Sequence, residues 1–140
     1  MQLSPYLAFK GNCAEAFGFY ERLLGGKIVM MMTHAGSPAA EHTPPEWQDK
    51  IMHARLALGD QVLMGSDAPP QHQQTPQGFS VSLQIDDPVE GERIFNGLAE
   101  NGTVKMPFQQ TFWAEGFGMC VDRFGIPWMV NCEGAKSAAS

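Results

Sequence analysis

The stretch PYLAFKGNCAEAFGFYERLLGGKIVMMMT, residues 5–33, decides the fold of this chain. It begins within a short apolar run, Leu3 to Phe9, which predicts a strand. Alanine, phenylalanine, tyrosine and leucine then recur at helical spacing, and Asn12 followed three residues later by Glu15 is typical of a helix N-terminus. Gly25 predicts the helix end, because glycine readily takes the left-handed conformation that follows a helix.

Three strands are expected to follow this helix: Lys27 to Thr33, Ile51 to Leu58 and Gln61 to Ser66. The dipeptide Gly59-Asp60 predicts a two-residue hairpin turn between the last two. The first half of the chain therefore has the order strand, helix, strand, strand, strand.

The second half of the chain repeats this order. Phe79 to Ile85 alternates apolar and polar residues, as a half-buried strand does. Asp87 is the expected N-cap of a second helix, with Pro88 at the first helical position. The three later strands are predicted over Val104 to Phe112, Phe117 to Asp122 and Trp128 to Cys132.

This repeated unit predicts an α+β protein. We expect a duplicated βαβββ module that forms a twisted mixed sheet, with both helices on its convex face and an open concave cleft. The predicted single domain covers residues 1–134, with halves at about 1–68 and 78–133. Residues 135–140 are expected to be a flexible tail.

Two proline-rich segments stand outside this pattern, residues 35–50 and 67–78. Their proline and polar content argues against regular helices or strands. Loops of this length are often lids or binding loops, and plain surface connectors explain the composition equally well. The sequence leaves both interpretations open.

Composition argues against several classes of function. The chain has 9 basic and 15 acidic residues, and its net charge of −6 argues against nucleic acid, because phosphate contacts need clustered Lys and Arg. No apolar run approaches the about 20 residues that cross a bilayer, and the first residues form no secretion signal, so we expect a cytoplasmic protein. The cysteines have no C-x-x-C spacing and are interpreted as free thiols in a reducing compartment: Cys13, Cys120 and Cys132.

Three strings of sequence carry a resemblance to a known family. PYLAFKGNCAEAFGFY at 5–20, GSD at 65–67 and QTFWAEGFGMCVDRFGIPWMVN at 110–131 resemble the PhnB-like branch of the vicinal-oxygen-chelate superfamily, which includes glyoxalases and bleomycin-resistance proteins. The resemblance runs from about Leu3 to Asn131. It implies the duplicated fold, a small-molecule ligand, and a homodimer in which the neighbouring subunit often completes the cleft.

Two activities are associated with names in this branch. Such domains are sometimes called demethylubiquinone methyltransferases, but this sequence has no glycine-rich nucleotide-binding turn directly after a strand. The name PhnB is associated with phosphonate metabolism, which no residue here demonstrates. A link to phosphonates is therefore held only as an alternative.

Members of the wider superfamily hold a divalent metal with His and Glu side chains from the first, fourth, fifth and eighth strands. On this chain the resemblance places other residues at these positions, namely Pro5, Met64, Ser80 and Met129. No His, Asp or Glu lies within two residues of any of them. Because such ions bind imidazole and carboxylate groups, we expect no metal at this position and no cofactor.

The hairpin turn predicts which residues face the concave side. Counting outward from the turn places Arg55 opposite Met64. The same count places His53 opposite Ser66, and directly opposed residues share a face. Arg55 would present a planar fork that fits carboxylate or phosphonate oxygens, and a structural salt bridge is an equally good interpretation. For His53 a hydrogen-bonded structural role is favoured over catalysis.

The second half supplies the remaining cleft residues. Ser82 and Gln84 share a face with Ser80, because strand side chains alternate. Asn131 likewise shares a face with Met129. The predicted ligand-binding set is His53, Arg55, Met64, Ser80, Ser82, Gln84, Trp113, Met129 and Asn131.

The turn between the sixth and seventh strands adds one candidate base, Glu115. His53 and Glu115 are thus the candidate catalytic residues. Trp113, in the same turn, is interpreted first as a packing or interface residue. The other histidines lie at or beyond strand ends and are expected to be solvated: His34, His42 and His72.

Three hypotheses for the function follow. The first is a metal-free, homodimeric protein that binds a small molecule, for which the hypothesis is an anion, and sequesters or senses it as bleomycin-resistance proteins do. The second is an enzyme, an isomerase, lyase or dioxygenase relative, that uses His53, Arg55 or Glu115, or a metal bound in an unfamiliar way. The third, which the sequence favours least, is a structural dimer without a small ligand.

Overall fold

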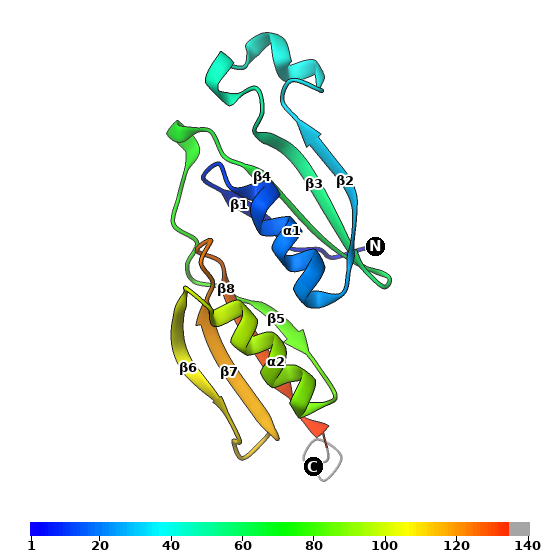
Figure 1. Cartoon of the computed structure of the whole chain (residues 1–140), viewed down its shortest axis with the longest axis vertical. Helices are drawn as coiled ribbons and strands as arrows, with labels where there is room; N and C mark the ends of the chain where they lie inside the picture. The colour runs from blue at the N-terminus through cyan, green and yellow to red at the C-terminus, as the bar shows by residue number, and fades with distance from the viewer. Residues whose placement is uncertain (135–140) are drawn as a thin grey trace. The chain divides into compact units, whose positions relative to one another are not determined.

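The computed structural model describes residues 1–134, and the predicted tail at 135–140 lies outside the described residues. The chain divides into two compact units, unit 1 with Met1–Gln74 and unit 2 beginning at Thr75. Each unit has one long helix and a four-stranded mixed sheet (Figure 1). The predicted duplication of a βαβββ module is therefore confirmed, and each half forms a sheet of its own.

Unit 1 contains β1 (Tyr6–Phe9), α1 (Cys13–Leu24), β2 (Lys27–Thr33), β3 (Ile51–Leu58) and β4 (Gln61–Asp67). The strand order is β1-β4-β3-β2, with β1 parallel to β4 and the other neighbours antiparallel. Leu58 pairs with Gln61, which confirms the two-residue hairpin turn. β1 begins later than predicted because the side chain of Leu3 is almost fully exposed and adds nothing to the core.

Unit 2 contains β5 (Val81–Gln84), α2 (Pro88–Ala99), β6 (Thr103–Gln109), β7 (Gly116–Val121) and β8 (Pro127–Cys132). Its order, β5-β8-β7-β6, repeats that of unit 1, with β5 parallel to β8. β6 ends before the predicted Phe112, since its pairing with β7 stops at Gln109 and Phe112 is 91% exposed. No helix in the described part of the chain has the length and apolar character that crossing a bilayer requires.

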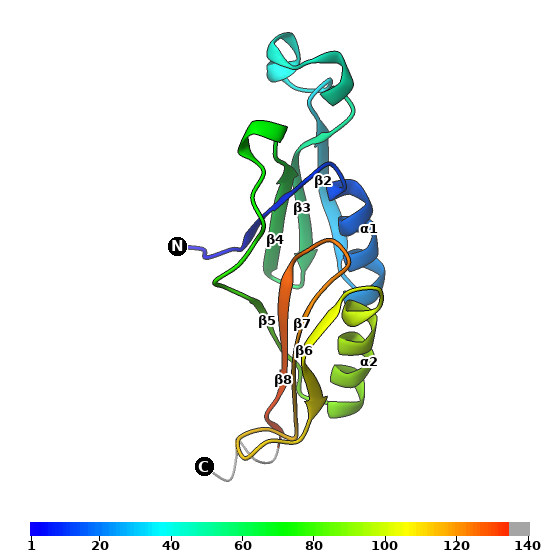
Figure 2. The same ribbon diagram turned by 90° about the vertical axis from the view of Figure 1, so that its left-hand side faces the viewer.

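The helix of each unit packs on one face of its own sheet and leaves the other face open (Figure 2). In unit 1 the buried side chains of Phe17 and Tyr20 lie on α1, and Ala54 and Leu56 of β3 are buried on the same side of the sheet. Burying one such large side chain stabilises a protein by about 1.5 to 3 kcal/mol. Phe17 lies directly over Gly65 of β4, where a β-carbon would come within 2.9 Å of the ring.

The start of α1 is capped by Asp67 of β4. The predicted cap, Asn12, occupies the N-cap position but its side chain makes no capping hydrogen bond. Instead, the Asp67 carboxylate accepts the backbone N–H groups of Gly11 at 3.0 Å, Cys13 at 2.9 Å and Ile51 at 2.8 Å. This single buried carboxylate therefore joins the end of β1, the first turn of α1 and the start of β3.

Two aspartates accept backbone hydrogen bonds in unit 2. Asp87 caps α2 as predicted, accepting the backbone N–H of Val89 at 3.0 Å. Asp122, at the end of β7, accepts the backbone N–H of Ile126 at 3.0 Å and the indole N–H of Trp128 at 2.8 Å. Asp122 thus fixes the β7–β8 turn from a buried position.

The proline-rich segments contain short helices, contrary to the prediction that they lack regular structure. Three 3₁₀ turns begin at prolines: Pro38–His42, Pro45–Trp47 and Pro70–His72. Proline favours the first position of a short helix because its fixed backbone angle suits that position and its missing N–H is not needed there.

We expect Asp67→Ala to destabilise unit 1 strongly. The substitution leaves three backbone N–H groups without an acceptor, and each unsatisfied buried group costs about 1 to 3 kcal/mol, so the loss should reach about 3 kcal/mol. Asp67→Asn should lose less, because the amide keeps one acceptor oxygen. Urea unfolding followed by circular dichroism measures the free energies of unfolding.

The control for this series is Asp60→Ala in the exposed hairpin turn, which should change stability by less than about 0.5 kcal/mol. Equal stability of Asp67→Ala and Asp60→Ala would show that the carboxylate does not hold the three segments.

Candidate functional site

The open face of the unit 1 sheet carries a row of side chains that crosses all four strands. The pairing register aligns, from β1 through β4 and β3 to β2, the residues Tyr6, Met64, Arg55 and Met30. We call these four residues the Arg55 row. The predicted opposition of Arg55 and Met64 is confirmed. Their sequence neighbours Ala54 and Leu63 are buried, so the row lies on the side away from α1.

Arg55 is a half-buried cation without a counter-charge in its own unit. Its Nε atom is closed off from solvent and has no hydrogen-bond partner. The guanidinium makes no hydrogen bond or ion pair with any residue between 1 and 134. Met30 and Met64 flank it in the row. A charge between apolar neighbours is costly unless it is paired, and the described part of the chain provides no acceptor for Arg55.

His53 lies on the same face of β3, two residues from Arg55. The Tyr6 hydroxyl lies 3.2 Å from Nδ1 of His53, and the two rings stack with their centroids 5.7 Å apart. The predicted opposition of His53 and Ser66 falls past the last β3–β4 pair. Sequence analysis missed Tyr6, although its alternation with the buried Leu7 indicates that it faces the open side.

Unit 2 has an equivalent row on its open face. From β5 through β8 and β7 to β6 the register aligns Ser82, Met129, Met119 and Met106, which we call the Met119 row. Met119 occupies the position that Arg55 has in unit 1, since each lies on the third strand of its unit. The prediction included Ser82 and Met129, and it missed Met119 and Met106 because it did not count pairs across β6 and β7.

Three more of the predicted residues meet in a hydrogen-bonded chain beside the Met119 row. The indole N–H of Trp113 donates to Oδ1 of Asn131 at 3.3 Å, and Nδ2 of Asn131 donates to Oε1 of Gln84 at 2.8 Å. Nε2 of Gln84 in turn donates to the Ser82 hydroxyl at 3.2 Å. The Trp113 ring also packs edge-on against Phe117 at 5.2 Å, which agrees with its interpretation as a packing residue.

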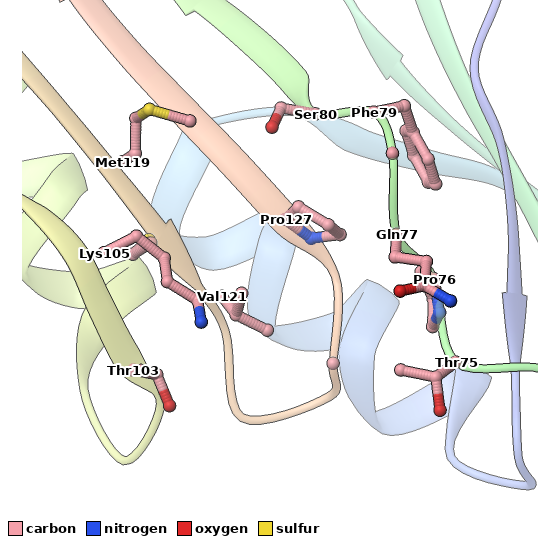
Figure 3. Close-up of a pocket in the computed structure, with 13 residues that line it drawn as sticks. Thr75, Pro76, Gln77, Phe79, Ser80, Thr103, Lys105, Met119, Val121 and Pro127 are labelled. Atoms are coloured by element: carbon pink, nitrogen blue, oxygen red, sulfur yellow. The ribbon is translucent and has the colours of Figure 1, made fainter.

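A pocket of about 450 Å³ opens in unit 2 (Figure 3). Its wall includes Ser80, Met119 and Lys105. Ser80 lies in the segment before β5, so it belongs to this pocket and not to the row that contains Ser82. Lys105 lies at an irregularity in the pairing of β6 with β7, and it brings to the pocket a cation that the sequence did not single out.

Glu115, the predicted candidate base, lies directly before β7 in unit 2, beside the end of β8. Its backbone N–H donates to the carbonyl of Cys132 at 2.8 Å, and its carboxylate is next to Gly134. Burial raises the pKa of the Cys132 thiol, and the charges of Asp87 and Glu115 raise it further. The two candidate catalytic residues, His53 and Glu115, therefore belong to different units.

Comparison with known proteins decides the family. The model of the 3-demethylubiquinone-9 3-methyltransferase family matches residues 1–131. This chain belongs to that family. The Escherichia coli (strain K12) protein YjdN is 40% identical over 139 residues, which cover 94% of this chain and 95% of YjdN.

Two solved structures are similar to this member of the 3-demethylubiquinone-9 3-methyltransferase family. Protein PA1353 from Pseudomonas aeruginosa is 50% identical, with a TM-score of 0.88 over 96% of this chain and 98% of that one. The PhnB protein from Bacillus cereus, described as a putative member of the same family, has a TM-score of 0.78 at 24% identity over 94% of this chain and 99% of its own.

The predicted membership of the PhnB-like branch is confirmed by these matches. A glyoxalase/bleomycin resistance protein/dioxygenase family enzyme from Burkholderia phytofirmans PsJN shares the fold, with a TM-score of 0.63 at 10% identity over 93% of this chain and 96% of its own.

The residues that the resemblance places at the superfamily's metal position, Pro5, Met64, Ser80 and Met129, do not fit a divalent ion. The strand partners of Met64 and Met129, which are Tyr6 and Ser82, add no imidazole or carboxylate. A phenol, an alcohol and thioethers are poor substitutes for the imidazole and carboxylate groups that hold such ions. Within 1–134 no three or more His, Cys, Asp and Glu residues gather as a metal site would require. The absence of a bound metal stays a prediction.

We therefore expect that adding Zn²⁺, Ni²⁺ or Mn²⁺ to this protein, after all metal has been removed from it, leaves its melting temperature unchanged. An ion that binds the folded protein raises stability by mass action, by about 2.7 kcal/mol at a concentration 100 times its Kd. Thermal unfolding with each ion and elemental analysis of the purified protein measure this. A stoichiometric ion, or a saturable rise in melting temperature, would contradict the expectation.

The cysteines are free and buried, as the thiol prediction requires: Cys13, Cys120 and Cys132. Burial raises the pKa of Cys120 to about 11, and the charge of Asp122 contributes in the same direction. Burial likewise raises the pKa of Cys13 and of Cys132. Because a raised pKa keeps a thiol protonated and unreactive at neutral pH, these cysteines are poor nucleophiles.

The native protein should accordingly release no colour from Ellman's reagent at pH 8, whereas the urea-unfolded chain should release one equivalent per cysteine. Absorbance at the thionitrobenzoate maximum measures both reactions. One thiol that reacts quickly in the native protein at pH 7 would contradict this expectation and make that cysteine a candidate nucleophile.

Proposed function

We propose that this PhnB-like protein binds a small anionic molecule on the open face of unit 1, without a divalent metal at the superfamily's usual position. The observation that carries the proposal is the half-buried Arg55, which has no acceptor in the described residues. A planar guanidinium donates two parallel hydrogen bonds to carboxylate, phosphate or phosphonate oxygens. Such an anion would satisfy both the charge and the hydrogen-bonding groups of Arg55.

The neighbours of Arg55 support a ligand that has an apolar part as well as a charge. Met30 and Met64 flank the guanidinium, and flexible thioether side chains adapt to ligands of different shape. Alternate residues on a strand are about 7 Å apart on one face, so a small ligand on Arg55 can also contact His53. The Tyr6–His53 pair then contributes hydrogen-bonding groups at the edge of the site.

Binding without chemistry is the form of this function that we favour. The protein would sequester or sense its ligand, as a homodimer in the cytoplasm. The edge strands β2 and β6 expose Val29 and Val104, apolar side chains that a second copy could cover. Three free cysteines support a reducing compartment.

An enzyme is the second candidate, and the Tyr6–His53 pair favours it. The Tyr6 hydroxyl engages Nδ1 of His53, and no described group hydrogen-bonds to Nε2. A histidine held in this way can accept or donate a proton through Nε2. Arg55 on the same face would stabilise a negatively charged intermediate. This arrangement suits the isomerases and lyases of the superfamily.

Arg55→Met is the sharpest test, because methionine is the natural residue at the equivalent position of unit 2, Met119. We expect the variant to stay folded and to bind methylphosphonate or inorganic phosphate at least about tenfold more weakly, since hydrogen bonds to charged groups contribute about 1.5 to 3 kcal/mol each. Isothermal titration calorimetry of apo protein at fixed ionic strength measures the affinities.

The matched control is Lys27→Met. Lys27 pairs with Ala57, which shares the open face with Arg55, so the control removes the same charge from an exposed position on the same sheet. Its binding should remain close to that of the unmodified protein. Equal losses of affinity in both variants would show that only the net charge matters. Unchanged affinity in Arg55→Met would show that Arg55 does not bind the anion.

A further inference from the structure

A pocket of about 450 Å³ on the open face of unit 2 takes no part in the function proposed above (Figure 3). One wall is the segment 75–80, which precedes β5, and the floor is formed by residues of β6, β7 and β8. Val121 of β7 pairs with Pro127 of β8 and with Thr103 of β6, so the floor crosses three neighbouring strands. All the lining residues belong to unit 2, so this unit 2 pocket is separate from the Arg55 row.

The floor of the unit 2 pocket is apolar. Met119, Val121 and Pro127 line it, and all three are half-buried. Directly paired residues share a face of a sheet, and so do residues two apart on one strand, so these side chains form one continuous surface. Apolar surface that a ligand covers contributes to binding through the hydrophobic effect. The floor therefore fits the apolar body of a small molecule.

The unit 2 pocket contains a positive charge and no negative one. Lys105 of β6 is the only charged residue among the described residues that line it, although the chain has 15 acidic residues. Its ammonium group makes no hydrogen bond or ion pair with any residue between 1 and 134, and its side chain extends toward Val121 in Figure 3. The neighbouring acid, Asp122, uses its carboxylate for the backbone N–H groups of Phe124 and Ile126. The charge of the wall therefore favours an anionic ligand.

Neutral polar side chains line the same pocket. They are the hydroxyls of Thr75, Ser80 and Thr103 and the amide of Gln77. None of these four side chains forms a hydrogen bond within the part of the chain that the structure describes. Hydroxyl and amide groups donate hydrogen bonds to a carboxylate, so they are available to share the negative charge of a ligand with Lys105.

The single lysine selects among anions. A lysine ammonium group is a compact point charge, whereas the guanidinium of Arg55 is a planar fork that matches phosphate and phosphonate oxygens. One unit charge on the wall balances one negative charge, and the net charge of −6 on the protein disfavours a second negative charge on the ligand. A monocarboxylate therefore fits the unit 2 pocket better than a phosphate dianion does.

We propose that the unit 2 pocket binds a small apolar carboxylic acid in its ionised form. The carboxylate lies against Lys105, and an aromatic or branched aliphatic body covers the floor of Met119, Val121 and Pro127. The volume of the pocket lies within the range of about 300 to 1,000 Å³ that is usual for small-molecule sites. The ligand class and the residues both differ from those proposed for Arg55, so the two proposals stand or fall separately.

Benzoate and its neutral analogue benzamide test the proposal in the full-length protein. Spectra of protein labelled with ¹³C at the methionine methyl groups report where each compound binds, because Met119 lines the unit 2 pocket whereas Met30 and Met64 flank Arg55. We expect benzoate to move the Met119 signal saturably at constant ionic strength. Benzamide should bind at the same place about two- to fivefold more weakly, since an exposed ion pair contributes modestly. Methionine-to-leucine variants assign the three signals.

Lys105→Gln removes the charge from an exposed side chain and should stay folded. It should bind benzoate and benzamide with equal affinity, whereas the matched control Lys27→Gln, an exposed lysine of unit 1, should keep the preference for benzoate. Equal affinities in the unmodified protein, or a benzoate preference that survives Lys105→Gln, would overturn the proposal. So would a Met119 signal that stays still up to about 50 mM benzoate, including the case in which only the Met30 and Met64 signals move.

Discussion

The carboxylate of Asp67 holds unit 1 together at the point where three segments of chain meet. It accepts backbone N–H groups from the end of β1, the first turn of α1 and the start of β3. These bonds set where β1 lies beside β4 and where β3 begins, and both placements determine the Arg55 row. Tyr6 lies beside Met64 in the pairing of β1 with β4, and Arg55 lies on β3 four residues after Ile51. The proposed site therefore depends on a carboxylate on the opposite face of the sheet.

The two units use the same backbone plan for different chemistry. The two rows match position by position. The second residue is a methionine in both rows, Met64 and Met129, and so is the fourth, Met30 and Met106. The difference lies on the third strand, where Arg55 in unit 1 corresponds to Met119 in unit 2. Unit 1 thus presents a cation and an imidazole, and unit 2 presents thioethers beside a chain of amide groups. The two open faces therefore differ in charge and in hydrogen-bonding groups.

The sequence was sufficient for the features that depend on nearby residues. Element order, the β3–β4 hairpin and the opposition of Arg55 and Met64 follow from periodicity and a two-residue turn, and all three are confirmed. The predicted capping residue of α1 was wrong. Asp67 lies 54 residues from Cys13 in the sequence, and no local pattern predicts that a carboxylate from another strand caps the helix. Hydrogen bonds to a buried carboxylate from a distant part of the sequence depend on the tertiary fold.

The same distinction explains the differences in the site. β1 pairs with β4 and β5 pairs with β8 in parallel, and no short turn fixes the register of such pairs. The sequence alone therefore did not predict that Tyr6 pairs with Met64, or that Ser82 pairs with Met129. The 3₁₀ turns of the two proline-rich segments were not predicted either, because helices of one turn have no periodic pattern of apolar residues.

Arginine side-chain resonances give the most direct view of whether Arg55 receives an anion. In ¹⁵N–¹H spectra of the labelled protein, the Nε–Hε signal of Arg55 is identified by its loss in Arg55→Met, and Arg22 on the exposed surface of α1 serves as the internal reference. Titration with methylphosphonate should move the Arg55 signal saturably and leave the Arg22 signal in place. An Arg55 signal that stays still, or that drifts with added salt in step with Arg22, would contradict recognition of an anion by this guanidinium.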